Sequence, residues 1–265
     1  MPKINDQSYL LKDQYRDSAN LDARVRLHVL FSTNKQGWNR WYFDQLDLPP
    51  NARILELGCG PGYLWRDNLD RIPSGWDTTL SDFSAGMIDQ ARANLSSQDF
   101  RYEIIDAQSI PYDAGTFDAV IANHMLYHVP DRASALSEMR RVLNATGRAY
   151  LATNGARHLV ELDDLTRRFD PQVNLGWDQR AHDMFSIDTG SAELQPWFPS
   201  IEVRRYDDAL IVTEVQPLVD YILSMADPVV AAQCRAELTA FIEGEMQANG
   251  AIHITKDSGL FIARP

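Results

Sequence analysis

Three glycines at alternate positions, 58, 60 and 62, constrain the fold of this chain more than any other feature. They follow the mainly apolar residues 54–57, which are typical of a buried strand, and precede residues of helical character. Glycine is favoured where the backbone takes a positive φ or lies against a ligand. The free N–H groups of a helix that starts at such a turn can bind a polar group. We therefore predict a nucleotide-like ligand at the carboxyl end of a first parallel strand.

Strand-like and helix-like segments alternate along the chain after this turn. The hydrophobic pattern predicts strands at 77–80, 100–105, 117–122 and 147–153, with helices at 85–95 and 133–143. Strands that alternate with helices predict a parallel sheet with helices on both faces.

The glycine-rich run resembles the first motif of the class I S-adenosylmethionine-dependent methyltransferases, and further matches follow in register. Asp82 comes at the end of the second predicted strand, Asp106 and Ala107 end the third, and residues 123–131 follow the fourth. The resemblance is to the small-molecule type, similar to the enzymes of ubiquinone and menaquinone biosynthesis.

This resemblance, which covers roughly residues 51–155, implies an α/β fold. We expect a Rossmann-like, doubly wound, seven-stranded and mostly parallel sheet with an antiparallel last strand. No repeat or linker divides the chain, so we predict a single methyltransferase domain over residues 1–265. Its expected parts are a helical N-terminal cap (1–48), a cofactor-binding core (51–155), an inserted lid (156–200), and C-terminal helices with the last strands (201–265).

The resemblance also implies S-adenosyl-L-methionine as the cofactor. Asp82 would accept both ribose hydroxyls, because a carboxylate takes two donors at once. Phe83 and Met87 would flank the adenine, Asp106 would accept its amino group, and Glu56 would orient the turn and the cofactor ammonium. The predicted cofactor site comprises the turn, the strand ends and their neighbours: Glu56, Gly58, Cys59, Gly60, Gly62, Asp82, Phe83, Met87, Asp106, Ala107 and Asn123.

Several of these residues have structural alternatives. Asp82 is suited to cap the helix that begins near Ser84, and Phe83 and Met87 are suited to the core. The turn could serve a dinucleotide enzyme, but its G-x-G-x-G spacing differs from the G-x-G-x-x-G of that class. The register of Asp82 after the second strand favours cofactor binding.

Candidate bases follow the fourth predicted strand, where methyl transfer to a hydroxyl or an acidic carbon would need one. His124 and His128, with Tyr127 between them, are the predicted catalytic residues. A spacing of four places both histidines on one side if the segment is helical. Alternatively, His128 only forms hydrogen bonds with the backbone in the turn before Pro130.

Aromatic and cationic residues near the N-terminus are candidates for contact with the cofactor or the substrate. Tyr15 or Trp38 could cover the cofactor, because an aromatic face favours a positive sulfonium. Arg24, Arg26 and His28 could recognise a substrate carboxylate, or could form a solvated helix face.

Composition argues against several other classes of protein. The net charge is −12 and no dense basic run is present, so nucleic acid is a poor partner. The two cysteines, Cys59 and Cys234, lack the spacing of a zinc site or a disulfide framework. We find no Asp…Asp-Asn set like that of the magnesium-dependent catechol enzymes, and therefore predict no metal. We see no signal peptide or membrane span, and expect a cytoplasmic protein with a small-molecule substrate.

The predicted function is methylation of a small molecule, with S-adenosylhomocysteine as the co-product. Two alternatives stay open. The other carbons of the sulfonium could be attacked, which would give cyclisation or aminocarboxypropyl transfer. The chain could also be a non-catalytic module that binds the cofactor or a partner.

Overall fold

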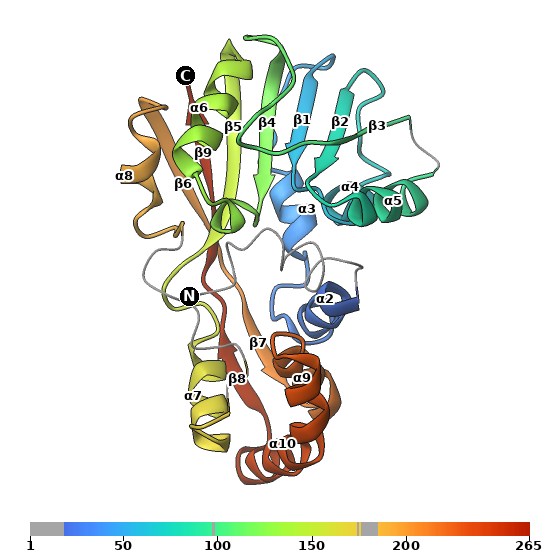
Figure 1. The fold of residues 1–265 in the computed structure, drawn as a ribbon, viewed down its shortest axis with the longest axis vertical. Coiled ribbons are helices and arrows are strands. Elements are labelled where there is room, and N and C mark those ends of the chain that lie inside the picture. Colours follow the sequence, from blue (N-terminus) through green and yellow to red (C-terminus); the bar gives the residue numbers. More distant parts are fainter. Residues whose placement is uncertain (1–18, 97–98, 174, 176–184) are drawn as a thin grey trace.

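A seven-stranded sheet forms the upper half of the molecule (Figure 1). The structure is a computed structural model that describes residues 19–96, 99–173, 175 and 185–265. The strand order is β3-β2-β1-β4-β5-β9-β6. Only β9 runs opposite to the other six strands of this sheet, so the predicted fold class is confirmed. The strands are β1 (Arg53–Leu57), β2 (Asp77–Asp82), β3 (Arg101–Ile104), β4 (Phe117–Asn123), β5 (Leu143–Asn154), β6 (Ser200–Tyr206) and β9 (Ser258–Arg264).

Helices cover both faces of this sheet because its strands carry apolar side chains on both sides. In β1, Leu55 and Leu57 pack with α6 (Arg132–Val142) on one face, whereas Ile54 packs with the helices of the other face. Those helices are α3 (Trp38–Phe43), α4 (Tyr63–Arg66) and α5 (Ala85–Asn94).

A second hydrophobic core lies below the sheet and forms what we call the lower lobe (Figure 1). Three separate parts of the chain build it. They supply α2 (Ala19–Phe31), α7 (Val160–Phe169), β7 (Ala209–Val212), α9 (Val215–Leu223), α10 (Pro228–Asn249) and β8 (Ile252–Thr255). No helix in the described ranges is long and apolar enough to cross a membrane.

The expected lid segment, 156–200, is divided between the two cores. Its first part, α7, packs in the lower lobe, whereas Phe185, Leu194 and Phe198 pack against the sheet together with the short helix α8 (Gly190–Leu194). The rest of the lower lobe comes mainly from residues that were expected to be C-terminal helices. The sequence analysis placed no strand at β7.

The connection between the two halves is a bent antiparallel ribbon. β6 pairs with β9 as far as Tyr206 and Ser258, and β7 pairs with β8 from Ala209 and Thr255 onward. At the bend, the buried ion pair of Lys256 and Asp208 joins the two segments of the chain that form the ribbon.

The end of α2 is fixed to the same bend. Ser32 Oγ donates to Asp208 Oδ2 over 2.8 Å, and Ser32 forms an isolated bridge with Leu210. The N-terminal helix is therefore anchored to the ribbon on which the lower lobe is built.

Candidate functional site

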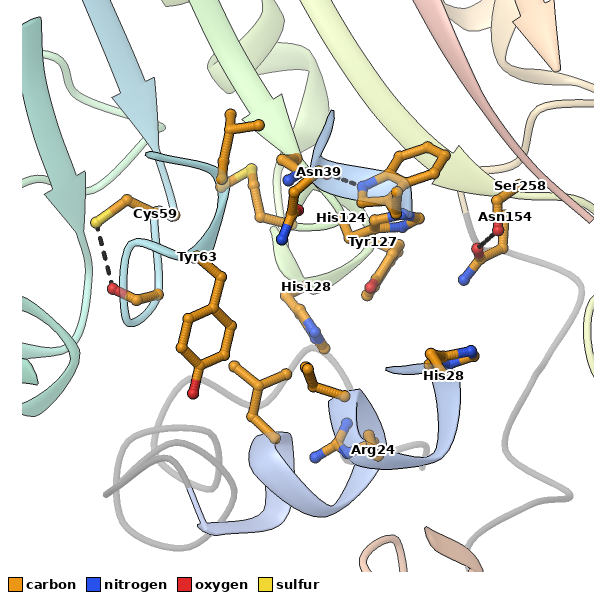
Figure 2. Close-up of a pocket in the computed structure, with 18 of the residues that line it drawn as sticks. Arg24, His28, Asn39, Cys59, Tyr63, His124, Tyr127, His128, Asn154 and Ser258 are labelled. Atoms are coloured by element: carbon orange, nitrogen blue, oxygen red, sulfur yellow. Dashed lines mark hydrogen bonds between the residues drawn. The ribbon is translucent and has the colours of Figure 1, made fainter. Parts of the chain in front are cut away.

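A pocket of about 1150 Å³ lies between the carboxyl ends of β1, β2 and β4 and the lower lobe. Figure 2 shows Cys59 and Tyr63 at one side of the pocket, His124, Tyr127 and His128 near its centre, and Arg24 and His28 on the opposite wall. In an open α/β sheet, ligands bind outside the carboxyl ends of the strands, and this pocket has that position.

The glycine-rich turn takes backbone conformations that side chains disfavour. Gly58, Gly60 and Gly62 have φ values of 68°, 54° and 77°. A Cβ at position 58 would come within 2.8 Å of Met125, and one at position 62 within 2.6 Å of Leu95. At Gly60 the nearest atom would be 3.9 Å away, so the turn presents bare backbone to the pocket there. The predicted turn is therefore confirmed in its conformation.

Cys59 lies within this turn as a small buried residue. Burial raises the pKa of its thiol well above the ordinary value, with smaller contributions from Asp82 and Glu56. A thiol that keeps its proton is a poor nucleophile, so Cys59 serves the turn through its backbone and its size.

Asp82 ends β2 with its carboxylate against the same turn. Its Oδ2 accepts from the Gly60 N–H over 2.9 Å, and its Oδ1 accepts from the Ser84 N–H over 2.8 Å. Burial raises the pKa of this carboxyl, and the backbone N–H donors oppose that rise. Each oxygen retains a lone pair for another donor. The structural alternative for Asp82 was to cap the next helix. Ser84 is the residue that caps α5, and its side chain accepts from the Met87 N–H.

The residues expected around the adenine all line the pocket, but they differ in exposure. Phe83 is 38% exposed, whereas Met87 is buried in the core. Asp106 Oδ1 accepts hydrogen bonds from the backbone N–H of Gln108, over 2.9 Å, and from the Gln108 side-chain amide. The neighbouring Ala107 is buried. Met87 therefore packs in the core, which was its structural alternative, and also lines the pocket.

Glu56 is buried at the end of β1 and accepts a hydrogen bond of 2.5 Å from the Trp65 indole. Burial raises the pKa of this carboxyl to about 7, the Trp65 N–H lowers it, and the charge of Asp82 raises it further. Glu56 is thus an acid that a nearby cation would ionise. The sequence analysis did not identify Trp65 as its partner.

The predicted catalytic segment is not a continuous helix. Only Leu126–His128 forms a 3₁₀ turn, and His124 lies before it with a φ of 57°. The condition under which the two histidines would share one side, a helical segment, is therefore not met. The Tyr127 and His128 rings are in contact, with centroids 4.5 Å apart. The backbone N–H of His128 donates to the Met125 carbonyl, a bond that any residue could form, so both roles of the imidazole stay predictions.

His124 packs its ring against Trp38, with centroids 4.9 Å apart. Burial lowers the pKa of His124 to about 4, and the charge of Lys256 lowers it further. A neutral imidazole with so low a pKa is a weak base. Trp38 donates its indole N–H to Asn123 Oδ1 over 3.1 Å and lines the pocket, whereas Tyr15 lies outside the described residues.

The pocket is also lined by residues that were not among the predicted site residues. Asn154 ends β5 and Ser258 begins β9, and both line the pocket with Lys256 and Tyr221. Arg24 and His28 line the pocket too, whereas Arg26 is exposed. The expected N-terminal cluster is thus divided between the pocket and the solvent.

Comparison with known proteins finds a family match in the core of the chain. Residues 55–151 match the family model described as "Methyltransferase domain". A ubiquinone/menaquinone biosynthesis C-methyltransferase from Desulfotalea psychrophila is 30% identical over 120 residues, which are 45% of this chain and 48% of that protein. A malonyl-[acyl-carrier protein] O-methyltransferase from Geobacter sulfurreducens is 33% identical over 159 residues, 59% of each chain. The chain thus spans about half the length of the curated relatives it matches.

Solved structures share the fold at low sequence identity. A phosphoethanolamine N-methyltransferase from Haemonchus contortus, in complex with S-adenosyl-L-methionine, has a TM-score of 0.60 and 17% identity, and covers 98% of this chain and 59% of its own. A candidate methyltransferase from Bacillus halodurans has a TM-score of 0.58 and 18% identity, over 85% of this chain and 97% of its own.

Proposed function

We propose that this chain, which carries a class I methyltransferase domain over residues 55–151, transfers a methyl group from S-adenosyl-L-methionine to a small-molecule acceptor. The main support for this proposal is that residues from separate strand ends meet in one pocket. The glycine-rich turn, Asp82, Asp106 and Asn123 come from four strand ends and line one pocket of about 1150 Å³. We place this activity in the cytoplasm.

The pocket residues fit the cofactor in charge and shape. Asp82 would hold the ribose hydroxyls with its remaining lone pairs, and the open side of Gly60 leaves room for the amino acid part. Glu56 would ionise beside the cofactor ammonium, since a neighbouring cation lowers the pKa of a carboxyl. Phe83 and Asp106 would contact the adenine.

The bound cofactor would supply a methyl group on a positively charged sulfur, which an aligned nucleophile can remove directly. The work of the chain is then to align the acceptor and to exclude water. Helix α2 closes the pocket opposite the sheet, and Trp38 lines it beside His124. Among the predicted catalytic residues, His124 is disfavoured as a base because burial lowers its pKa to about 4. We propose His128, with Tyr127 beside it, as the base if the acceptor needs one.

Calorimetric titration with S-adenosyl-L-methionine tests the cofactor site. Replacing Asp82 with Ala removes two charge-assisted hydrogen bonds to the ribose, and affinity should fall about 100-fold or more. Failure of the wild type to bind, or an unchanged affinity in Asp82→Ala, would contradict the proposal. Mass spectrometry of the co-product then identifies the reaction, because S-adenosylhomocysteine forms only when the methyl group leaves.

A further inference from the structure

The wall of the pocket made by α2 and the ribbon contains a polar atom with no partner. His28 lines the pocket, and its Nδ1 is buried without a hydrogen bond to any residue that the structure describes. Its ring lies edge-on to that of Tyr221, with centroids 5.7 Å apart. A buried polar atom without a partner is costly, so this atom is a candidate contact for a ligand in the pocket.

His28 is neutral in this position. Burial lowers the pKa of its imidazole to about 3, the charge of Lys256 lowers it, and that of Asp208 raises it. A neutral imidazole has one donor nitrogen and one acceptor nitrogen, and which tautomer is present depends on its partner.

Asn154 offers a second contact on the same side of the pocket. The Ser258 hydroxyl donates to Asn154 Oδ1 over 2.7 Å, and these residues pair across β5 and β9. This bond fixes the carboxamide, so its Nδ2 is left as a donor. Figure 2 shows Asn154 and His28 on the side of the pocket away from Cys59 and Tyr63.

The charges of Lys256 and Asp208 neutralise each other without a ligand. The side chains of Lys256 and Asp208 are only 7% and 0% exposed, and they pair directly. Lys256 lines the pocket and Asp208 lies behind it, so the ammonium is already neutralised by its partner and offers an anionic ligand little net attraction. The other contributions to the wall include the apolar side chains of Val25, Leu159 and Met225.

We propose that His28 and Asn154 bind the hydroxyl of an uncharged, mainly apolar substrate. A hydroxyl both donates and accepts, so it satisfies the Asn154 donor and either tautomer of His28. An ether accepts only, and a carboxylate would bury a charge. Arg24, one turn earlier on α2, makes a carboxylate the rival class. The inference rests on the proposed function, because it describes the acceptor side of the same pocket.

Three matched probes test this subsite: 4-propylphenol, 4-propylanisole and 4-propylbenzoate. Calorimetry with wild-type protein saturated with S-adenosylhomocysteine should show that the phenol binds about tenfold more tightly than the ether or the benzoate, the effect of one neutral hydrogen bond. His28→Phe should remove most of the preference for the phenol over the ether, because only the phenol can donate to that imidazole. Asn154→Ala removes a donor that both oxygens accept from, so it should weaken the binding of both probes. Arg26→Gln, on the exposed face of the helix that carries His28, is the matched control and should retain the preference.

The inference fails if the benzoate binds as tightly as the phenol, if the phenol does not bind, if the preference survives in His28→Phe, or if Asn154→Ala leaves the affinity for both the phenol and the ether unchanged. S-adenosylhomocysteine is titrated first, and its failure to bind would refute the proposed function instead. Titrations of the three probes without S-adenosylhomocysteine then test the subsite by itself. Unchanged S-adenosylhomocysteine affinity in both variants shows that the cofactor side remains folded.

Discussion

Replacing Glu56 with Gln should stabilise the protein at neutral and alkaline pH. Glu56 is 1% exposed, and burial raises its pKa from 4.5 to about 7. The folded state therefore holds this proton more tightly than the unfolded state does, and stability falls as pH rises from 4.5 to 7. The penalty for ionising Glu56 in the folded state, on the order of 3 kcal/mol, is complete above pH 7. A glutamine removes it and can still accept from the Trp65 indole.

Urea unfolding from pH 4.5 to 8, followed by tryptophan fluorescence, measures this effect. The free energy of unfolding of Glu56→Gln, minus that of the wild type, should rise from near zero to roughly 3 kcal/mol. Glu237→Gln, at an exposed position of α10, is the matched control and should show no such rise. A difference that stays constant or falls with pH would refute the reasoning.

The same carboxyl links cofactor binding to proton release. A cofactor ammonium beside Glu56 would favour its ionised form, so binding near pH 6 should release a proton. Calorimetry in two buffers of different ionisation enthalpy measures that proton, and Glu56→Gln should release none.

Three further substitutions test other features of the structure. Lys256→Met should cost about 3–5 kcal/mol of stability because it leaves Asp208 charged and buried, and the double variant with Asp208→Asn should recover much of that loss in urea unfolding. Gly62→Ala, at a φ of 77°, should cost about 1–3 kcal/mol and weaken cofactor affinity in calorimetry. Tyr42→Phe removes a buried 2.9 Å hydrogen bond to a carbonyl of β5 and should lower stability by about 1 kcal/mol in thermal unfolding.

The sheet could be predicted from the sequence because its signals are local. Apolar runs of strand length, separated by helical segments, indicate a parallel sheet without any knowledge of distant contacts. Asp82 and Asp106 could be selected because the end of a predicted strand already defines its position at the sheet edge. The positive φ values of the turn could be predicted because three of the five residues 58–62 are glycines.

The pocket wall at Asn154 and Ser258 could not be predicted, because it depends on contacts between distant positions. Asn154 and Ser258 are 104 residues apart and meet only when β9 inserts beside β5. The lower lobe likewise joins α2 to helices nearly 200 positions later. His124 shows a different limit: its spacing from His128 suggested a helical side, but its positive φ takes it out of any helix.

The bent ribbon also bears on how such a chain can diversify. The segment from 207 to 257 leaves the sheet at Tyr206 and returns at Ser258, two residues that pair directly across neighbouring strands. An insert whose two ends are already adjacent can be lengthened, shortened or exchanged without altering the strand order. Because the proposed cofactor residues lie at the ends of other strands, such an exchange would change the pocket wall at Tyr221 and Met225 while the sheet and the proposed cofactor contacts remain unchanged.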